Sequence, residues 1–331
     1  MSAKITIVPQ FVEVAAGAGG LSRGFIDAGF EPLLLNDNDK ICCQTLQKNH
    51  PNVLVKCCDM KTLEISHPKR IDILMGGIPC QSFSLAGKKK GLEDERGNLM
   101  LVFSKMVKKY SPPVFLIENV KGLLYHDDGK TLQKILDSFD ASIYDISYKV
   151  LNANDYGVAQ KRERLFIVGV KYSLEKKFTY PEKEKKKPVL RDVLFPVPIP
   201  NKEGVNYSEK KKKILQLVPP GGCWVNLPKE MQKNYLGKSY TSGGGKRGIA
   251  RRLSYDEPCL TLTTSPCQKQ TERCHPEFIR PFTVQEYTRI QSFPDDYIFC
   301  GSTSQKYKQI GNAVPIILAK KIAERIWTLF N

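Results

Sequence analysis

Residues 5–117 alternate short apolar runs with stretches of helical periodicity, and glycines or polar residues follow the runs. The first run, residues 5–14, is β-branched and apolar, and a glycine-rich segment and a helix-like stretch at 21–28 come after it. The pattern repeats with apolar runs at 32–35, 53–57, 71–75 and 114–117 and helix-like stretches at 40–49 and 99–109. Strands that alternate with helices pair in parallel, because each helix carries the chain back to the same edge. The sequence therefore predicts an α/β fold with a doubly wound, mostly parallel sheet.

Polar side chains follow four of the predicted strands. Asp37, Asp59, Cys80 and Glu118 each come just after an apolar run. The carboxyl ends of parallel strands meet at one edge of the sheet, and ligands of such folds bind at this edge. We therefore expect these four side chains to contribute to one site.

A change in composition near residue 185 indicates a second domain. From there the chain carries lysine runs, frequent prolines and two glycine runs, and its periodicity weakens. Residues 316–329 again place apolar side chains at helical spacing, which predicts a helix that returns to the first domain. We predict a first domain of residues 1–184 and 312–331, and a smaller irregular domain of residues 185–311 inserted into it.

Positive charge is concentrated in one part of the chain. The 331 residues include 51 Lys and Arg against 34 Asp and Glu, a net charge of +17. Residues 171–279 hold 22 of the basic and 11 of the acidic side chains, so most of the surplus lies there. Such a segment attracts polyanions, which makes nucleic acid the leading partner. A lysine-rich surface that only maintains solubility remains the alternative at this point.

Composition also argues against several classes of protein. No apolar run approaches the ~20 residues of a membrane-spanning helix, and the first residues lack the apolar core of a signal peptide. Ten cysteines in a chain of this length favour reduced thiols, so we expect a cytoplasmic protein. Neither Cys267, Cys274 and His275 nor the cysteine pairs 42–43 and 57–58 match a zinc motif, and we expect no metal site.

The glycine segment after the first run suits the binding of a nucleotide or nucleoside. Missing side chains at Gly17, Gly19 and Gly20 would let a ligand approach the backbone at a helix N-terminus. The spacing does not match G-x-G-x-x-G, which argues against a nicotinamide dinucleotide. Asp37 could accept hydrogen bonds from a ribose diol and Asp59 one from an adenine amine. Either carboxylate could instead cap the following helix.

Cys80 and Glu118 have the chemistry for addition to a conjugated ring. Cys80 lies in a glycine-led loop after a strand, where a thiolate could act as a nucleophile. Burial of Glu118 could raise its pKa enough to keep or share a proton near neutrality. A small buried apolar residue is the alternative for Cys80, and a helix-capping acid the alternative for Glu118.

Seven motifs resemble, in the same order, those of the DNA (cytosine-5) methyltransferases of bacterial restriction-modification systems. They are Ala16-Gly17-Ala18-Gly19-Gly20, Gly76-Gly77-Ile78-Pro79-Cys80-Gln81, Arg96-Gly97, Glu118-Asn119-Val120, Gln160-Lys161-Arg162-Glu163-Arg164, Arg280 through Arg289-Ile290-Gln291-Ser292-Phe293-Pro294, and Gly311-Asn312-Ala313-Val314-Pro315. The resemblance covers nearly the whole chain. It implies the S-adenosylmethionine-dependent methyltransferase fold, with residues 185–311 as a target-recognition domain.

The resemblance implies methyl transfer to C5 of a cytosine in a short, specific sequence of double-stranded DNA. Cys80 would add to C6 of a flipped-out base, and Glu118 would contact N3 and the exocyclic amine. Arg164 would contact the cytosine O2 and help to hold Glu118. The expected catalytic residues are thus Cys80, Glu118, Arg162 and Arg164, and Arg162 and Ser84 would touch the DNA backbone. The methyl donor would be S-adenosylmethionine.

The same resemblance assigns further residues to the cofactor and to DNA. Asp37 would hold the cofactor ribose, Asp59 the adenine amine, and Asn312 the side of the methionine moiety. The full set of expected cofactor-binding residues is Ala16, Gly17, Gly19, Gly20, Asp37, Asn38, Asp59, Met60, Pro79 and Asn312. The expected DNA-binding residues are Gln81, Ser84, Arg96, Gln160, Lys246, Arg247, Arg251, Arg252, Thr261 and Thr263.

Three positions depart from the family's pattern. Ala15 stands where the family usually has Phe, and Asn38 where an aromatic residue is frequent, while Glu13 replaces the common Asp. Loss of both aromatic faces would remove about 1 kcal/mol or more of packing on an adenine. The departures therefore concern the cofactor affinity and not the fold.

Three hypotheses follow for the function. The first is an active DNA cytosine-5 methyltransferase that acts as a monomer, with a separate cognate restriction endonuclease as a conceivable partner. The second is a DNA-binding relative with weak or no activity. The third is a transfer-RNA cytosine-5 methyltransferase, against which the size of the basic insertion and the absence of a Cys-Phe-Thr signature argue.

Overall fold

The chain forms two compact units, which we describe separately. In this computed structural model the described residues are 8–65, 70–78, 98–195, 203–241 and 248–331. The first unit comprises Met1–Tyr156, Glu163–Lys183 and Ala313–Asn331, and the second comprises Gly157–Arg162 and Glu184–Asn312. These divisions lie within one residue of the domain limits expected at 184 and 312. The short segment Gly157–Arg162, which we expected in the first domain, belongs to the second unit.

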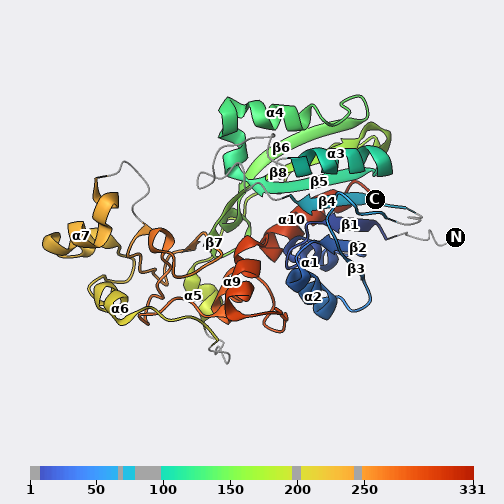
Figure 1. Ribbon diagram of the computed structural model, residues 1–331. Helices are drawn as coiled ribbons and strands as arrows, with labels where there is room; N and C mark the ends of the chain where they lie inside the picture. The colour runs from blue at the N-terminus through green and yellow to red at the C-terminus, as the bar shows by residue number, and fades with distance from the viewer. Residues whose placement is uncertain (1–7, 66–69, 79–97, 196–202, 242–247) are drawn as a thin grey trace. The chain divides into compact units, whose positions relative to one another are not determined.

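A seven-stranded sheet forms the centre of the first unit (Figure 1). Its strand order is β3-β2-β1-β4-β5-β8-β6. Pairing is parallel from β3 through β5, whereas β8 runs antiparallel to both β5 and β6. The predicted mostly parallel, doubly wound α/β sheet is thereby confirmed. The strands are β1 (Gln10–Val14), β2 (Glu31–Asp37), β3 (Leu54–Cys57), β4 (Ile73–Gly77), β5 (Val114–Val120), β6 (Tyr144–Asn152) and β8 (Glu163–Lys171).

Helices cover the two faces of this sheet. The helices of the first unit are α1 (Gly20–Asp27), α2 (Lys40–Asn49), α3 (Asn98–Tyr110), α4 (Lys130–Leu136) and α10 (Ile316–Trp327), with short 3-10 segments at η2 (Lys121–Gly129), η3 (Ala153–Tyr156) and η4 (Tyr172–Leu174). Alternate side chains of β1 point to opposite faces of the sheet, as in any β-strand. Val12 and Val14 pack in the cluster that α3 and α4 cover, while Phe11 contacts Phe25 of α1.

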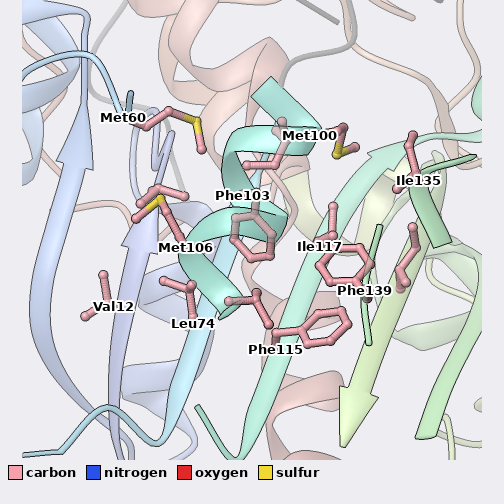
Figure 2. Packing of buried hydrophobic residues seen from close by; sticks show 14 of the residues in the cluster. Val12, Met60, Leu74, Met100, Phe103, Met106, Phe115, Ile117, Ile135 and Phe139 are labelled. Atoms are coloured by element: carbon pink, nitrogen blue, oxygen red, sulfur yellow. The ribbon is translucent and has the colours of Figure 1, made fainter. Parts of the chain in front are cut away.

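The face under α3 and α4 holds a large apolar core (Figure 2). Phe103 and Met106 of α3 project onto the sheet, and the Phe115 ring of β5 stacks on Phe139 with 4.5 Å between ring centroids. Ile135 of α4 closes the same cluster. Each large apolar side chain buried here contributes about 1.5–3 kcal/mol to folding. This core fixes the positions of the central strands.

On the opposite face α1 packs closely against α10. Phe25 and Phe30 continue the aromatic contact from Phe11 to Trp327 of the C-terminal helix. Gly24 permits the approach, since an added Cβ would stand 2.7 Å from the Lys320 backbone nitrogen. The helix expected at 316–329 is therefore present, ends at Trp327 and joins the first unit as predicted.

Several strand limits differ from those expected. We placed Glu118 beyond the end of its strand, but β5 continues through Val120 and Glu118 lies within it. The cause is the antiparallel neighbour β8, which pairs with β5 as far as Val120 opposite Arg164. Asp37 is likewise the last residue of β2. Helix α2, by contrast, has the limits expected for residues 40–49.

The second unit is irregular, with short helices around a small core. Its elements are α5 (Leu190–Leu194), α6 (Glu209–Gln216), α7 (Lys229–Leu236), α8 (Val284–Ile290), α9 (Thr303–Asn312), the 3-10 segments η5 (Trp224–Asn226), η6 (Gly237–Tyr240) and η8 (Lys269–Thr271), and a parallel pair of β7 (Gln160–Lys161) with β9 (Cys259–Leu260). Tyr207, Leu215, Val218, Leu227 and Cys274 form much of the core. Side chains rather than long ladders must therefore satisfy many backbone groups in this unit.

Two kinds of feature are absent from the described residues. No helix among them has the length and apolar character needed to cross a membrane. Within the same residues, no cluster of three or more His, Cys, Asp or Glu side chains is arranged to hold a metal ion.

We predict that Gly24→Ala destabilises the first unit. Alanine favours helix over glycine by about 1 kcal/mol, but overpacking typically costs about 1–3 kcal/mol. Here the new methyl group would overlap Ala319 and the backbone of α10. The net free energy of unfolding, measured by urea denaturation, should therefore fall. Lys48→Ala on α2 is the control and should change it by less than about 0.5 kcal/mol. A Gly24→Ala protein as stable as the parent would contradict the close packing of α1 on α10.

Candidate active site

An acid and a guanidinium meet where β5 lies beside β8. The Glu118 Oε1 atom is 3.0 Å from the Arg164 Nε atom, and both side chains are largely buried. Glu118 and Val120 point to the same face, and Val120 pairs with Arg164 across the strands. Burial lowers the pKa of Arg164, and the charge of Glu118 opposes this change. The sheet thus holds a charge-assisted pair in a mostly dehydrated position.

The neighbouring strand leads toward the expected nucleophile. Gly77, the last residue of β4, pairs directly with Glu118 of β5. A Cβ at Gly77 would lie 3.4 Å from the Glu118 Oε2 atom, so glycine leaves room beside the carboxylate. The Asn119 side chain donates a hydrogen bond of 3.0 Å to the Ile78 carbonyl and ties down the residue that follows. The chain reaches Cys80 two residues later.

Several expected residues lie outside the described parts of the chain. They are the nucleophile candidate Cys80, the cofactor candidate Pro79, and the DNA candidates Gln81, Ser84, Arg96, Lys246 and Arg247.

The glycine segment and Asp37 come together at the ends of β1 and β2. The Asp37 carboxylate accepts hydrogen bonds of 2.8 Å from the Gly17 and Asp39 backbone nitrogens. Gly17 and Gly19 both have positive φ angles, which glycine adopts without strain. At Gly20, which begins α1, an added Cβ would overlap the Val314 carbonyl oxygen. The turn therefore requires glycine for conformation and for packing.

The structure excludes one of the two alternatives for Asp37. Asp39, rather than Asp37, caps α2, because its side chain accepts from the Ile41 backbone nitrogen at 2.9 Å. The capping role considered for Asp37 is thus wrong. Asp59 accepts from the Lys61 backbone nitrogen at 2.9 Å and organises a turn after β3. Burial raises the pKa of Asp37, and its backbone donors oppose this change.

The other expected cofactor residues differ in exposure. Ala16 is buried, and its backbone nitrogen donates to the Asn36 carbonyl at 2.9 Å. Asn38 and Asn312 are exposed, whereas Met60 is buried in the core under α3. Met60 therefore packs mainly against other apolar side chains. In the described residues, a Cβ at Gly17 would meet no heavy atom within 4 Å, so the space before this turn is open to a ligand.

Glu13 is a buried acid that the sequence analysis noted only as a departure from the family's pattern. It lies in β1 with 1% of its surface exposed, and its Oε2 atom has no hydrogen-bond partner among the described residues. Burial raises the pKa of Glu13 to about 8, Ser22 opposes this change, and the charges of Asp37 and Glu118 add to it. An acidic residue within an apolar strand was the sequence signal for this group.

Gln160 and Arg162 hold the second unit together from within. Arg162 is 1% exposed, and its guanidinium donates to the carbonyls of Leu262, Gly311 and Asn312 at 3.2, 2.8 and 3.3 Å. The fully buried Gln160 side chain accepts from the Leu262 nitrogen at 2.9 Å. The expected DNA contacts of both residues are corrected, because the structure uses these side chains to bind loop backbone.

Other expected DNA contacts are also engaged inside this unit. Arg252 donates to the carbonyls of Val218, Pro276 and Glu277, all at 3.1 Å. Arg251 forms an ion pair of 3.0 Å with Glu257. The hydroxyls of Thr261 and Thr263 donate to the carbonyls of Lys161 and Ser265 at 2.7 and 2.9 Å. These four partly exposed side chains thus have partners within the unit, and their contacts with DNA stay a prediction.

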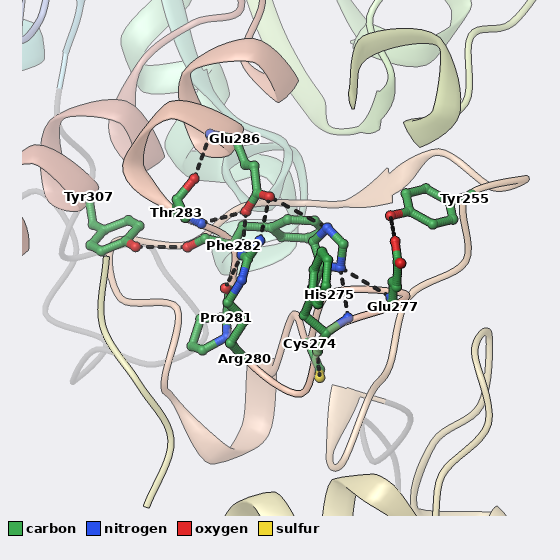
Figure 3. Close-up of polar contacts among 11 residues, drawn as sticks. Tyr255, Cys274, His275, Glu277, Arg280, Pro281, Phe282, Thr283, Glu286 and Tyr307 are labelled. Atoms are coloured by element: carbon green, nitrogen blue, oxygen red, sulfur yellow. Dashed lines mark hydrogen bonds and ion pairs between the residues drawn. The ribbon is translucent and has the colours of Figure 1, made fainter. Parts of the chain in front are cut away.

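A polar network surrounds the start of α8 in the second unit (Figure 3). Thr283 and Glu286 form a capping box, and Arg280 binds both Glu286 oxygens at 2.7 and 2.8 Å. Burial acts to raise the pKa of Glu286, but Arg280 and His275 outweigh it and the pKa is lowered. Burial lowers the pKa of His275 to about 4, and its Nδ1 accepts from the Glu277 and Phe278 nitrogens at 3.1 Å. His275 is therefore a neutral structural residue at neutral pH.

Comparison with known proteins gives a consistent result. Residues 9–328 match the family model of the C-5 cytosine-specific DNA methylases. The chain belongs to this family. It is 50% identical to the type II methyltransferase M.Sau96I of Staphylococcus aureus, over 96% of this chain and 76% of that protein. It is 47% identical to M.Eco47II of Escherichia coli, over 97% of this chain and 79% of that protein.

A solved structure shows the same fold at low identity. The Entamoeba histolytica methyltransferase EhMeth superposes with a TM-score of 0.70 at 15% identity, over 97% of this chain and 98% of that one. The family membership makes the protein a DNA cytosine-5 methyltransferase of the restriction-modification type. S-adenosylmethionine is its methyl donor, and DNA is its substrate.

We predict that Glu13 makes stability depend on pH. Its pKa is about 8 in the folded protein against an ordinary value of 4.5, so the folded protein retains a proton that the unfolded chain releases. The free energy of unfolding should therefore decrease as the pH rises from 4.5 to 8, by at most about 1.4 kcal/mol per pH unit from this group.

Urea denaturation at several pH values tests this prediction. Glu13→Gln removes the titrating proton but keeps the shape, so its stability should change less between pH 5 and 8 than that of the parent. Asp140→Asn is the control, since Asp140 is exposed and its pKa is lowered by Ser142. Parallel curves for the parent and Glu13→Gln would show that Glu13 is not protonated in the folded state.

Proposed function

We propose that Cys80 is the nucleophile of the cytosine-5 methyltransferase reaction, and that Glu118 and Arg164 form the group that binds and activates the base. The observation that carries this proposal is the strand register: Gly77 at the end of β4 pairs with Glu118, and Glu118 binds Arg164 at 3.0 Å. The segment that leads to Cys80 thus begins beside a carboxylate already held by a guanidinium.

Each of the three side chains would have its own role in the addition. The Cys80 thiolate forms a bond to C6 of the cytosine, and the electron pair of the C5–C6 double bond moves to C5, which becomes the nucleophile that accepts the methyl group. Glu118 binds N3 and the exocyclic amine and thereby stabilises the electron-rich ring. Arg164 keeps the carboxylate in place and can donate to O2 through its planar guanidinium. Loss of the C5 proton after methyl transfer restores the double bond and expels the Cys80 thiolate.

The glycine turn and Asp37 fit the methyl donor. Open space before Gly17 and the carboxylate at the end of β2 offer room and a hydrogen-bond acceptor for the ribose of S-adenosylmethionine. This cofactor supplies an electrophilic methyl group when bound. Ala16, Gly19 and Gly20 would shape the turn around it, and Asp59 would face the adenine amine. Exposed Asn38 presents no aromatic face to the adenine.

The second unit, in this proposal, recognises the target sequence in double-stranded DNA. Its segment of the chain carries most of the positive charge, and the guanidinium groups of Arg162 and Arg252 bind its backbone carbonyls. Exposed lysines such as Lys210 and Lys213 on α6 are then the side chains available to phosphates. A monomer acting in the cytoplasm beside a separate cognate endonuclease completes the proposal, in keeping with the type II methyltransferase names of its relatives.

We predict that Cys80→Ser abolishes methyl transfer but leaves DNA binding intact. The serine hydroxyl is a far weaker nucleophile at neutral pH than a thiolate. The assay is transfer of labelled methyl groups to unmethylated genomic DNA, followed by nucleoside analysis for 5-methylcytosine. Cys300→Ser is the matched control and should keep activity. Turnover by Cys80→Ser would remove Cys80 from the nucleophile role.

Two further measurements separate the remaining alternatives. Transfer to unmodified transfer RNA in place of DNA would favour the RNA enzyme. DNA binding without transfer by the parent protein would indicate the inactive relative and would direct attention to Ala15 and Asn38.

We also predict a strong salt dependence of DNA binding. If the basic side chains of residues 185–280 neutralise about five phosphates, log affinity should fall with log salt at a slope near −4.5. Combined replacement of Lys210 and Lys213 by Gln should make the slope less negative by about 1.8. Lys211→Gln is unsuited as a control, because Lys211 pairs with buried Glu272. A slope near zero for the parent would contradict electrostatic binding.

A further inference from the structure

Two cysteines from different elements lie beside Asp37, whose carboxylate binds the glycine turn. Cys43 lies in α2, and Cys57 is the last residue of β3. Cys57 also pairs directly with Asp37 in the β2–β3 register. The Asp37 carbonyl accepts from the Cys43 Sγ atom at 3.3 Å. The neighbouring Cys58 nitrogen donates to the same carbonyl at 3.1 Å.

The thiol pair is therefore attached to the residue proposed to hold the cofactor ribose. The Asp37 carbonyl binds Cys43 and Cys58, while its carboxylate binds Gly17 and Asp39. A covalent change at Cys43 would remove one hydrogen bond to the Asp37 backbone. A disulfide between Cys43 and Cys57 would also link α2 covalently to the end of β3, next to Asp37.

The two thiols differ in accessibility. Cys57 is exposed, whereas Cys43 is buried. Burial raises the pKa of the Cys43 thiol, and Cys57 and Asp37 raise it further. An oxidant from solution would therefore meet Cys57 first, and Cys43 would react second, once it loses its proton.

We propose that Cys43 and Cys57 are a redox modification site at which a disulfide oxidant forms an intramolecular bond that weakens S-adenosylmethionine binding. The Cys57 thiolate attacks oxidised glutathione, forms a mixed disulfide and releases one glutathione thiolate. Cys43 then gives up its proton and attacks the Cys57 sulfur, which releases the second glutathione. Two protein thiols are oxidised to one disulfide, and one glutathione disulfide is reduced to two thiols.

Bond formation requires a local rearrangement next to Asp37. The two sulfur atoms must approach to the disulfide length of about 2.05 Å, which draws α2 and the end of β3 together. The Cys43 hydrogen that the Asp37 carbonyl accepts is lost in the same step. We expect the affinity for S-adenosylmethionine to fall about tenfold. This effect rests on the proposed cofactor role of Asp37, whereas formation of the bond does not.

The test starts with the full-length protein, incubated with oxidised glutathione and digested with trypsin without reduction. Cleavage after lysine gives peptides 41–48 and 57–61, each with two cysteines. Mass spectrometry should find these peptides linked, and fragmentation should place the bond between Cys43 and Cys57. Titration calorimetry with S-adenosylmethionine should show the tenfold loss, and dithiothreitol should restore the affinity.

Two matched variants test which cysteines form the bond and whether this bond causes the loss of affinity. Cys57→Ser should abolish both the linked peptides and the loss of affinity, while Cys58→Ser on the same strand end should retain both. By reciprocity, saturating S-adenosylmethionine should slow the bond's formation. The disulfide should also form faster at higher pH, because the Cys43 thiol must lose its proton before it attacks.

Each other outcome overturns a defined part of the inference. The proposed pair would be refuted if the reaction ended at the mixed disulfide of Cys57 with glutathione. A disulfide that involved Cys42 or Cys58 would refute it as well. A Cys43–Cys57 bond with unchanged affinity would refute the effect on the cofactor. Failure of the reduced protein to bind S-adenosylmethionine would instead refute the proposed cofactor site, and the peptide map would still decide whether the bond forms.

Discussion

The pairing of β5 with β4 on one side and β8 on the other is the constraint on which the candidate active site depends. Parallel pairing places Gly77 beside Glu118, and antiparallel pairing places Arg164 opposite Val120 on the face of Glu118. The apolar cluster under α3 and α4 buries Phe115 and Ile117 of the same strand and so fixes its position. An acid, a guanidinium and the segment that leads to the nucleophile candidate are thereby brought together by backbone ladders rather than by flexible loops.

Three carboxylates lie near the ends of the central strands, and burial gives them different properties. Burial raises the pKa of Glu13 to about 8, because ionisation is costly in a buried site where the Oε2 atom has no hydrogen-bond partner among the described residues. Asp37 keeps backbone donors, and Glu118 keeps Arg164. A neutral Glu13 reduces repulsion among the three groups. In our proposal, oxidation of Cys43 and Cys57 also affects Asp37, because Cys43 donates to the Asp37 carbonyl and Cys57 pairs with Asp37 between the strands.

The second unit shows why a count of basic side chains overstates the contacts with DNA. Short helices and one two-residue strand pair leave many carbonyls without regular partners. Arg162 and Arg252 each bind three such carbonyls, and Arg280 binds Glu286 at the start of α8. A guanidinium with five donors suits this bracing role. The unit is therefore held by the same residue type that the sequence assigned to nucleic acid.

Local pattern was enough to predict the α/β sheet, the helix at Lys40–Asn49, the returning helix at Ile316–Trp327 and the family, because periodicity and motif order are properties of neighbouring residues. The candidates Asp37 and Glu118 followed from their places at strand ends. Tertiary structure alone decided that Glu118 lies within β5, that Gln160 and Arg162 are buried, and that Cys43 and Cys57 both lie beside Asp37. These outcomes depend on partners distant in sequence, on burial and on the demand of loop carbonyls for donors, which local pattern does not contain.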